Sequence, residues 1–230
     1  MISLIIPVYN ESEHLPDLLE KIYSLPIRER LEVIVVDDSY DDLTLKSTEP
    51  FRNKLNLQVI HRKKRLGLSS AVMEGFASAS SNILICMDGD GSHPAEKISE
   101  LAGQVESGEL MVVASRNVTG GGCADEWSFL RKVISKFCCI LVRPLTGLKD
   151  PMSGFFAISK SFFDDVKPHV KPLSYKIGLE LAVKGRLKNI SEIPFKFEER
   201  KAGSSKVNFS VIMGMLYHFM GLFCWKIFVR

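Results

Sequence analysis

The chain has 230 residues, 46% of them hydrophobic and 25% charged, which is enough apolar sequence for the core of one large domain. A net charge of +3 is too small to indicate binding to nucleic acid, so we expect no nucleic-acid partner. Five cysteines, an odd number without CxxC or CxH spacing, argue against a disulfide framework or a zinc site.

Apolar runs of strand length alternate with helical stretches in the first half of the chain. The expected strands are residues 2–6, 31–36, 57–60, 83–87 and 110–114. Ser12 is expected to cap the first helix, and residues 67–80 and 94–106 give two more. The alternation predicts an α/β fold with a Rossmann-like, mostly parallel sheet covered by helices. The N-terminal run is too short for a signal peptide, so we expect a cytoplasmic catalytic region.

The pattern changes after about residue 116. Three consecutive glycines, residues 120–122, indicate a loop, and a helix is expected over residues 127–145. Strands over residues 155–159 and 190–197 follow, with a helix over 175–185 between them. No Pro- or Ser-rich linker interrupts the sequence, so we expect residues 1–206 to form one catalytic domain.

The last segment, residues 207–230, predicts a helix that is apolar nearly all round and associates with a membrane. Within residues 207–229 the clearly polar residues are Asn208, Ser210, His218 and Lys226. A membrane span needs about 20 predominantly apolar residues, which this segment barely supplies. A span, an interfacial or re-entrant helix and a buried terminal helix all remain open. Ser210, Gly214 and Gly221 form a stripe of small residues that could admit a helix of a membrane partner subunit or of a second copy.

Polar residues follow three of the expected strands. They are Tyr9-Asn10-Glu11, Asp37-Asp38-Ser39 and Asp88-Gly89-Asp90. The carboxyl ends of parallel strands meet at one edge of a sheet, so we expect these residues to converge on one ligand. Asp88 and Asp90 point the same way in an extended segment, and paired carboxylates suit Mg²⁺ or Mn²⁺ with a phosphate-bearing substrate, although a plain turn is the alternative. The basic run 62–65 is either a solvated loop or a patch for anionic lipid or phosphate.

Six motifs occur in a characteristic order: PVYNE, VVDDS, a GL segment after the basic loop, DxDxxHP, ASR and KDPMSGFF. In this order they resemble family 2 glycosyltransferases of the GT-A fold, and most closely the dolichol-phosphate (polyprenyl-phosphate) mannosyltransferases. The resemblance covers residues 1 to about 206. It implies transfer of mannose from GDP-mannose to dolichyl or polyprenyl phosphate at a membrane surface, with Mg²⁺ or Mn²⁺ as cofactor.

The resemblance also implies roles for individual residues. The nucleotide sugar would contact Pro7, Tyr9, Glu11, Val36, Asp38, Asp88, Gly89, Asp90, Arg200 and Lys206. The acceptor phosphate would be held by Arg116, Arg131 and Ser135, and these three residues with Asp90 are the expected catalytic residues. The expected metal ligands are Asp90 and Ser92. Asp150 falls in a family motif on the acceptor side, where it would orient an arginine or substrate hydroxyls, and a turn residue is the alternative.

Two positions depart from the family pattern. Ser92 stands where many relatives have a glutamine as a further metal contact, and serine is a smaller and weaker ligand. Gly89 replaces the alanine of the usual DAD motif, and we expect it to loosen the loop while both carboxylates are kept. His93 could coordinate metal, but the resemblance favours a structural role or a contact behind the metal ligands.

The acceptor decides what chemistry the site must supply. A phosphate monoester has a second pKa of about 6, so it is already anionic near neutral pH and needs no general base. We expect one displacement with inversion, at a site whose Arg and Lys residues hold two anions together. Two alternatives remain open: a UDP-glucose-dependent transferase to polyprenyl phosphate, and an inactive membrane-associated scaffold subunit.

Overall fold

The computed structural model describes residues 1–124, 129–171, 176–198 and 209–228, with side chains for all of these except 129–131 and 209–212. Within these residues the strands are β1 (Ile2–Val8), β2 (Leu31–Asp37), β3 (Asn56–His61), β4 (Ile83–Cys86), β5 (Met111–Ser115), β6 (Phe156–Ser159) and β7 (Ser191–Pro194). The α-helices are α1 (Leu15–Tyr23), α2 (Leu43–Thr48), α3 (Leu68–Ser78), α4 (Lys97–Glu106), α5 (Phe129–Thr146), α6 (Lys160–Val166), α7 (Ile177–Lys184) and α8 (Phe209–Phe228). Short 3₁₀ turns lie at Arg28–Arg30, Glu49–Phe51 and Lys167–His169.

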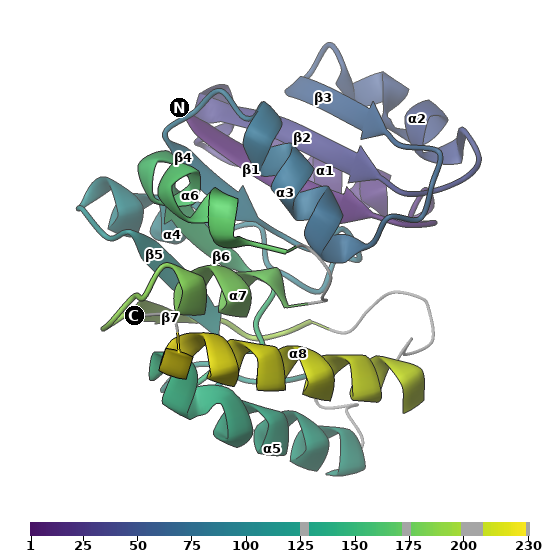
Figure 1. Cartoon of the computed structure of the whole chain (residues 1–230). Coiled ribbons are helices and arrows are strands. Elements are labelled where there is room, and N and C mark those ends of the chain that lie inside the picture. The colour runs from purple at the N-terminus through teal and green to yellow at the C-terminus, as the bar shows by residue number, and fades with distance from the viewer. Residues whose placement is uncertain (125–128, 172–175, 199–208, 229–230) are drawn as a thin grey trace.

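The strands form one sheet in the order β3-β2-β1-β4-β6-β5-β7 (Figure 1). Strand β6 runs antiparallel to both of its neighbours, β4 and β5, and the other neighbouring strands are parallel. Strands β1 to β4 supply one end of the sheet, and β5, β6 and β7 extend it. The predicted, mostly parallel α/β sheet is therefore confirmed.

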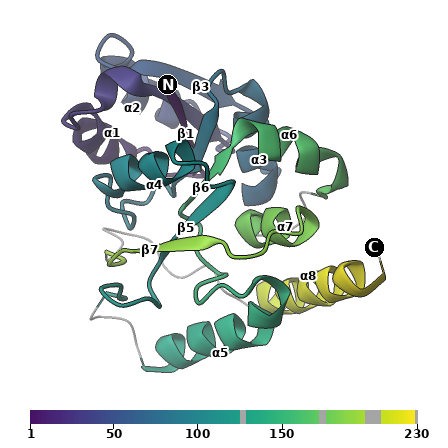
Figure 2. The same ribbon diagram turned by 90° about the vertical axis from the view of Figure 1, so that its left-hand side faces the viewer.

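Helices cover both faces of the sheet, and the alternation of side chains along β1 shows how. Leu4 and Ile6 lie in a buried cluster with apolar residues of α1 and α4. Ile5 points to the opposite face, where it joins a cluster with Val72 and Phe76 of α3. Figure 2 shows α1, α2 and α4 on one side of the sheet and α3, α6 and α7 on the other. Side chains on both faces of β1, β4 and β5 are buried, so these strands carry nearly continuous apolar runs.

Three details differ from the sequence-based expectation. Helices α2 and α6 were not predicted, because six and seven residues are too few for a helical repeat to stand out. Ser12 does not cap α1: the N-cap is His14, which makes no side-chain capping bond, and the Glu11 carbonyl accepts the amides of His14 and Leu15 instead.

Helices α5 and α8 lie side by side beyond α7, at the end of the molecule opposite β3 (Figures 1 and 2). Phe219 and Leu222 of α8 are buried against Val142 and Leu145 of α5 and Leu179 of α7. The other side of α8 exposes six large apolar residues, Met213, Leu216, Tyr217, Met220, Ile227 and Phe228. Helix α8 is therefore buried along one side and exposed along the other.

Among the described residues, no helix is both long enough and apolar enough to cross a bilayer. The stripe of small residues on α8 is uncovered where it is described, because a Cβ added at Gly214 or Gly221 would meet no atom within 4 Å. Ser210 belongs to the same helix, but its side chain lies outside the described residues. Association of this stripe with a partner helix stays a prediction.

Candidate active site

The polar residues after β1 and β2 lie together, as expected. Val8 pairs with Asp37 in the parallel ladder, and the Val8 carbonyl accepts the Asp38 amide at 3.0 Å. The amide of Asn10, which has a left-handed backbone with φ of 58°, donates to Ser39 Oγ at 2.9 Å. These contacts join the two loops at the carboxyl edge of the sheet, where open α/β sheets bind ligands.

Asp38 is almost fully buried and is held by the loop between β3 and α3. Arg62 Nε donates to Asp38 Oδ1 at 2.5 Å, and the Gly67 amide donates to Asp38 Oδ2 at 2.8 Å. The Arg65 guanidinium lies over the Tyr9 ring, 4.6 Å from its centroid. The solvated-loop interpretation of residues 62–65 is thus wrong for Arg62, whose side chain is 3% exposed.

Two other residues predicted to bind the nucleotide are register partners. Pro7 of β1 lies opposite Val36 of β2, and both are buried. The Val36 side chain packs in the core against Ala71 and Val72 of α3, so only its backbone can face a ligand. Glu11 lies at the start of the next loop and is partly exposed.

The glycine of the Asp-Gly-Asp motif permits close packing. A Cβ on Gly89 would lie 2.5 Å from Val8 Cγ1 and 3.2 Å from Ile6 Cγ2, so any larger residue would push the loop away from β1. Gly91 has φ of 76°, which favours glycine and turns the chain towards Ser92. The expected loosening of the loop is therefore not what the packing indicates: Gly89 lets the loop approach β1.

Asp90 and Ser92 form a compact oxygen site. The Ser92 hydroxyl donates to Asp90 Oδ1 at 2.5 Å, the Ser92 amide donates to the same oxygen at 3.1 Å, and both residues are buried. No group of three His, Cys, Asp or Glu side chains suitable for a metal occurs among the described residues. A carboxylate and a hydroxyl nevertheless fit Mg²⁺ or Mn²⁺, which commonly take one or two carboxylates and complete their shell with substrate phosphates and water.

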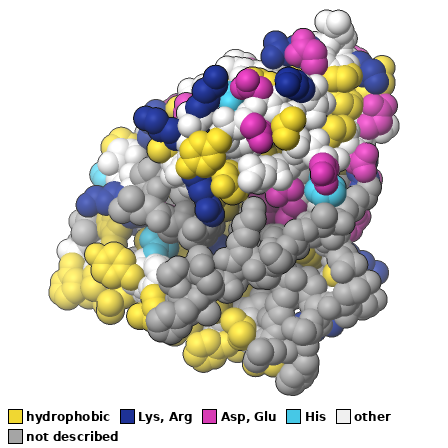
Figure 3. Space-filling view, turned by 90° about the vertical axis from the view of Figure 1, so that its right-hand side faces the viewer, with side chains coloured by type: hydrophobic (Ala, Val, Ile, Leu, Met, Phe, Trp, Pro, Cys, Tyr) yellow, Lys and Arg dark blue, Asp and Glu magenta, His cyan; other side chains and the backbone are white. Residues whose placement is uncertain are grey.

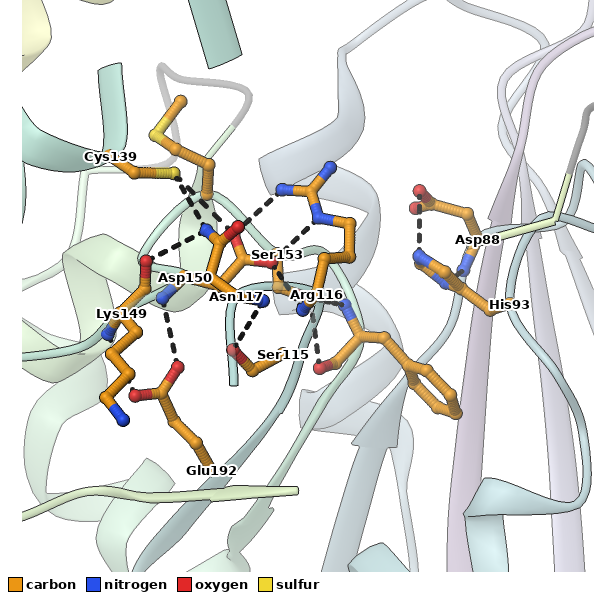
Figure 4. Close-up of polar contacts among 12 residues, drawn as sticks. Asp88, His93, Ser115, Arg116, Asn117, Cys139, Lys149, Asp150, Ser153 and Glu192 are labelled. Atoms are coloured by element: carbon orange, nitrogen blue, oxygen red, sulfur yellow. Dashed lines mark hydrogen bonds and ion pairs between the residues drawn. The ribbon is translucent and has the colours of Figure 1, made fainter. Parts of the chain in front are cut away.

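His93 has a structural role, as the resemblance suggested. Its ring stacks on Phe155 with centroids 4.9 Å apart, and Phe195 and Phe197 meet it edge-on. Nδ1 accepts the Asp88 amide at 3.0 Å, so that nitrogen carries no proton. Burial lowers the pKa of His93 despite the opposing charges of Asp88 and Asp90. The neutral ring fixes the start of the Asp-Gly-Asp loop (Figure 4).

Arg116, which was predicted to hold the acceptor phosphate, forms a buried ion pair with Asp150 (Figure 4). Asp150 Oδ2 accepts Arg116 Nε at 2.7 Å and the Arg116 amide at 3.0 Å, and Oδ1 accepts Nη2 at 2.8 Å. Burial raises the pKa of Asp150, but the hydrogen bonds and charge of Arg116 outweigh it and leave the pKa below its usual value. The predicted orienting role of Asp150 towards an arginine thus has a direct structural basis.

Lys176, immediately before α7, was not predicted as a site residue. Its Nζ donates to the Met152 carbonyl at 2.7 Å, and the side chain lines a small recess together with Asp88, Ser153 and Gly154. Burial and the charge of Arg116 lower the pKa of Lys176, while Asp88 and Asp150 oppose that shift. No spacing in the sequence signals this lysine, because folding alone brings it to Asp88.

Of the remaining predicted site residues, the structure describes the side chain of Ser135 alone. Ser135 is half-buried on α5. Arg131 lies one turn earlier on the same helix, which confirms their shared helical spacing, but its side chain lies outside the described residues. Arg200 and Lys206 also lie outside the described residues.

Comparison with known proteins shows which family this chain belongs to. Residues 3–167 match Glycosyl transferase family 2. The chain is 37% identical over 229 residues to a dolichol-phosphate mannosyltransferase of Pyrococcus furiosus, covering 98% of this chain and 64% of that relative. The chain thus spans slightly less than two thirds of that protein. A dolichol-phosphate mannosyltransferase of Saccharomyces cerevisiae is 32% identical over 234 residues, covering 97% of this chain and 87% of the relative.

Solved structures agree on the fold. A mannosyltransferase from Pyrobaculum calidifontis in complex with GDP-Man and Mn²⁺ has a TM-score of 0.69 and 16% identity, covering 98% of this chain and 64% of that one. A glucosyl-3-phosphoglycerate synthase from Mycobacterium tuberculosis has a TM-score of 0.67 and 18% identity, covering 98% and 79%. At such identities the likeness concerns the fold alone, which is GT-A. Because the family match spans most of the chain, this protein belongs to glycosyl transferase family 2, together with the dolichol-phosphate mannosyltransferases.

Proposed function

We propose that this chain transfers mannose from GDP-mannose to the phosphate of dolichol or another polyprenol, with inversion at the anomeric carbon. The observation that carries the proposal is the meeting of carboxylates with a half-buried lysine and a largely buried arginine at one edge of the sheet, where Lys176 shares a recess with Asp88 and lies near the Arg116–Asp150 pair. The names of the 37% and 32% identical relatives, both dolichol-phosphate mannosyltransferases, support mannose as the sugar and dolichol phosphate as the acceptor.

Asp90 and Ser92 would hold the divalent cation, which we propose to be Mg²⁺ or Mn²⁺. Both residues are buried and adjacent, so their oxygens are positioned before the substrate arrives. When bound, the cation neutralises the charge that develops on the departing nucleoside diphosphate. The carboxylate of Asp88, whose side chain is 28% exposed, lies on the same loop and would face the donor.

The acceptor phosphate would be bound by Arg116, with Arg131 and Ser135 on α5. Asp150 holds the Arg116 guanidinium through two of its nitrogens, which fixes the plane of the group. A preformed cation lowers the entropic cost of bringing two anions together. The phosphate is its own nucleophile, so the neutral, stacked His93 is not required as a base.

We further propose that α5 and α8 rest on the cytoplasmic surface of a membrane. Large apolar side chains are exposed on both helices, and those on α5 are Val133, Ile134, Phe137, Ile140 and Leu141. Lys132 and Lys136 are exposed on the same helix, as expected next to anionic lipid headgroups. Figure 3 shows hydrophobic side chains gathered at the lower edge of the molecule. This location brings a lipid-linked phosphate to the end of the molecule that carries Ser135.

The experiment that tests this function offers labelled GDP-mannose and UDP-glucose in parallel to the protein with polyprenyl phosphate in detergent, and follows label into the lipid fraction. We expect label from GDP-mannose only, and only with Mg²⁺ or Mn²⁺ present. Label from UDP-glucose alone would mean that the transferred sugar is glucose and not mannose. Label from neither donor would contradict an enzymatic function.

A further inference from the structure

Glu192 on β7 grips the loop that carries Asp150. Its Oε2 accepts the Lys149 amide at 2.8 Å, and its Oε1 accepts the Asp150 amide at 3.0 Å (Figure 4). Two consecutive amides thus donate to the two oxygens of one carboxylate, and hydrogen bonds to a charged acceptor are stronger than neutral ones. Because Glu192 lies opposite Val113 of β5 in the parallel ladder, its backbone is fixed to the strand that ends next to Arg116.

The same loop is held from its other side by Asn117. Asn117 Nδ2 donates to the Lys149 carbonyl at 2.9 Å, so the amide and the carbonyl of Lys149 are bound by different partners. The loop begins at Gly147, whose amide donates to the Arg143 carbonyl at the end of α5 at 2.8 Å. Hydrogen bonds from β7, from the residues after β5 and from α5 therefore hold the four loop residues 147–150.

The side chain of Asp150 has little freedom to compensate for a displaced backbone. It is fully buried, and its two oxygens accept three hydrogen bonds from Arg116. A movement of the loop by about 1 Å would break the paired hydrogen bonds between the Asp150 carboxylate and the Arg116 guanidinium. Displacements of that size strongly reduce the rate of a reaction that depends on the position of a group. The orientation of the Arg116 guanidinium therefore depends on where Glu192 holds the loop.

We infer that Glu192 is a positioning residue for the acceptor half of the site: it holds the Lys149–Asp150 backbone so that Asp150 fixes Arg116 for the incoming phosphate. Glu192 does not touch the reacting atoms. The kinetic part of this inference rests on the proposed transfer to a lipid phosphate. The geometric part concerns Arg116 alone.

Glu192→Gln tests the inference, because it keeps the shape of the side chain but sets an amide N–H against one of the two backbone N–H groups. We expect the KM for polyprenyl phosphate to rise about tenfold, the equivalent of about 1.4 kcal/mol, with the KM for GDP-mannose within about twofold. Glu109→Gln is the matched control: Glu109 accepts a hydrogen bond from the hydroxyl of Ser191, the residue next to Glu192, and does not contact the loop. It should leave both KM values unchanged. Equal changes in the two KM values of Glu192→Gln would overturn the positioning role.

A second readout does not require activity. The Nε–H resonance of Arg116, observed by NMR in protein with ¹⁵N-labelled arginine, reports its bond to Asp150. We expect this resonance to shift in Glu192→Gln, to shift less in Glu192→Asp, which keeps the charge on a shorter chain, and to stay in place in Glu109→Gln. An unmoved resonance in both Glu192 variants would overturn the inference. Absence of mannose transfer by the wild-type protein would refute the proposed function but leave this result interpretable.

Discussion

The two sides of the site, which we propose to bind the donor and the acceptor, are built in different ways. The proposed metal-binding carboxylate, Asp90, is held by Ser92 from its own loop, two residues away. Arg116 is held by Asp150, 34 residues away, and Asp150 in turn by Glu192, a further 42 residues along the chain. The proposed metal site is therefore held within one short motif, whereas Arg116 depends on contacts between distant segments of the second half of the chain. Substitutions on the two sides should fail in different ways.

Asp90→Ala should have the largest effect and should be confined to chemistry. Loss of one charge-stabilising position commonly costs about 10²–10³ in rate, so we expect transfer to fall by about 100-fold or more with little change in melting temperature. Excess Mg²⁺ or Mn²⁺ should not restore it. Asp164→Ala, which removes an exposed partner of Lys160 on α6, is the control and should keep full activity. Near wild-type transfer by Asp90→Ala would remove this residue from the metal site.

Asp150→Asn should instead damage both stability and acceptor use. Breaking a buried ion pair by neutralising one partner typically costs about 3–5 kcal/mol, because the buried Arg116 charge is left without its counter-ion. Denaturant unfolding would measure that loss, and steady-state kinetics should show a larger rise in KM for polyprenyl phosphate than for GDP-mannose. Unchanged unfolding would mean that the pair does not stabilise the fold.

The Arg116–Asp150 pair also predicts a pH dependence. The pKa of Asp150 is lower in the folded protein than in the unfolded chain. Its contribution to folding stability is therefore complete above the ordinary carboxyl pKa of about 3.9, and it is lost as the pH falls through the lower pKa of the folded state. The stability difference between wild type and Asp150→Asn should therefore be constant above about pH 5 and shrink below about pH 4. A difference that grew on acidification would contradict this sign.

Lys176→Met should have an intermediate effect, because it removes a half-buried cation that shares a recess with Asp88. We expect kcat/KM to fall about tenfold, as for the loss of one charge-assisted contact. The lowered pKa of Lys176 also predicts that wild-type activity declines at alkaline pH, as the amine loses its proton. Lys176→Arg should move that decline to higher pH, and an identical alkaline limb in wild type and Lys176→Arg would exclude Lys176 as its cause.

Lys226→Met should have the smallest effect and should act only on the acceptor side. Lys226 Nζ of α8 donates to the carbonyls of Pro144 and Leu145 at the end of α5, each at 2.7 Å. Loss of these largely exposed hydrogen bonds should lower the free energy of unfolding by about 1 kcal/mol and raise the KM for polyprenyl phosphate about twofold. Thermal melting and kinetics would detect both changes. A larger effect on GDP-mannose would contradict the division between the two sides.

The same division explains which parts of the structure could be predicted from sequence. Strands β1, β2 and β4 and the loops after them carry local signals, namely apolar runs ending in Asp38 and in Asp88-Gly89-Asp90, and these were predicted. The arginines over the donor loops were missed because Arg62 and Arg65 belong to a run whose composition resembles a solvated loop.

The acceptor side could be predicted only through the family resemblance, and then incompletely. Arg116 and Asp150 were expected there, but Lys176 and Glu192 have no local signal, since each acts on a segment more than 20 residues away. The sequence of α8, which is apolar nearly all round, also could not say which of its sides is covered. Packing of Phe219 and Leu222 against α5 and α7 decides that.

The measurement that tests the central claim most directly compares two acceptors that differ only in phosphate. GDP-mannose is supplied with either polyprenyl phosphate or the corresponding polyprenol, and the anomeric configuration of any mannosyl lipid is determined by NMR. We predict product with polyprenyl phosphate and none with polyprenol. The mannosyl lipid should have the β-configuration expected for one inverting displacement of the α-linked donor. Mannosylated polyprenol, or an α-linked product, would contradict it.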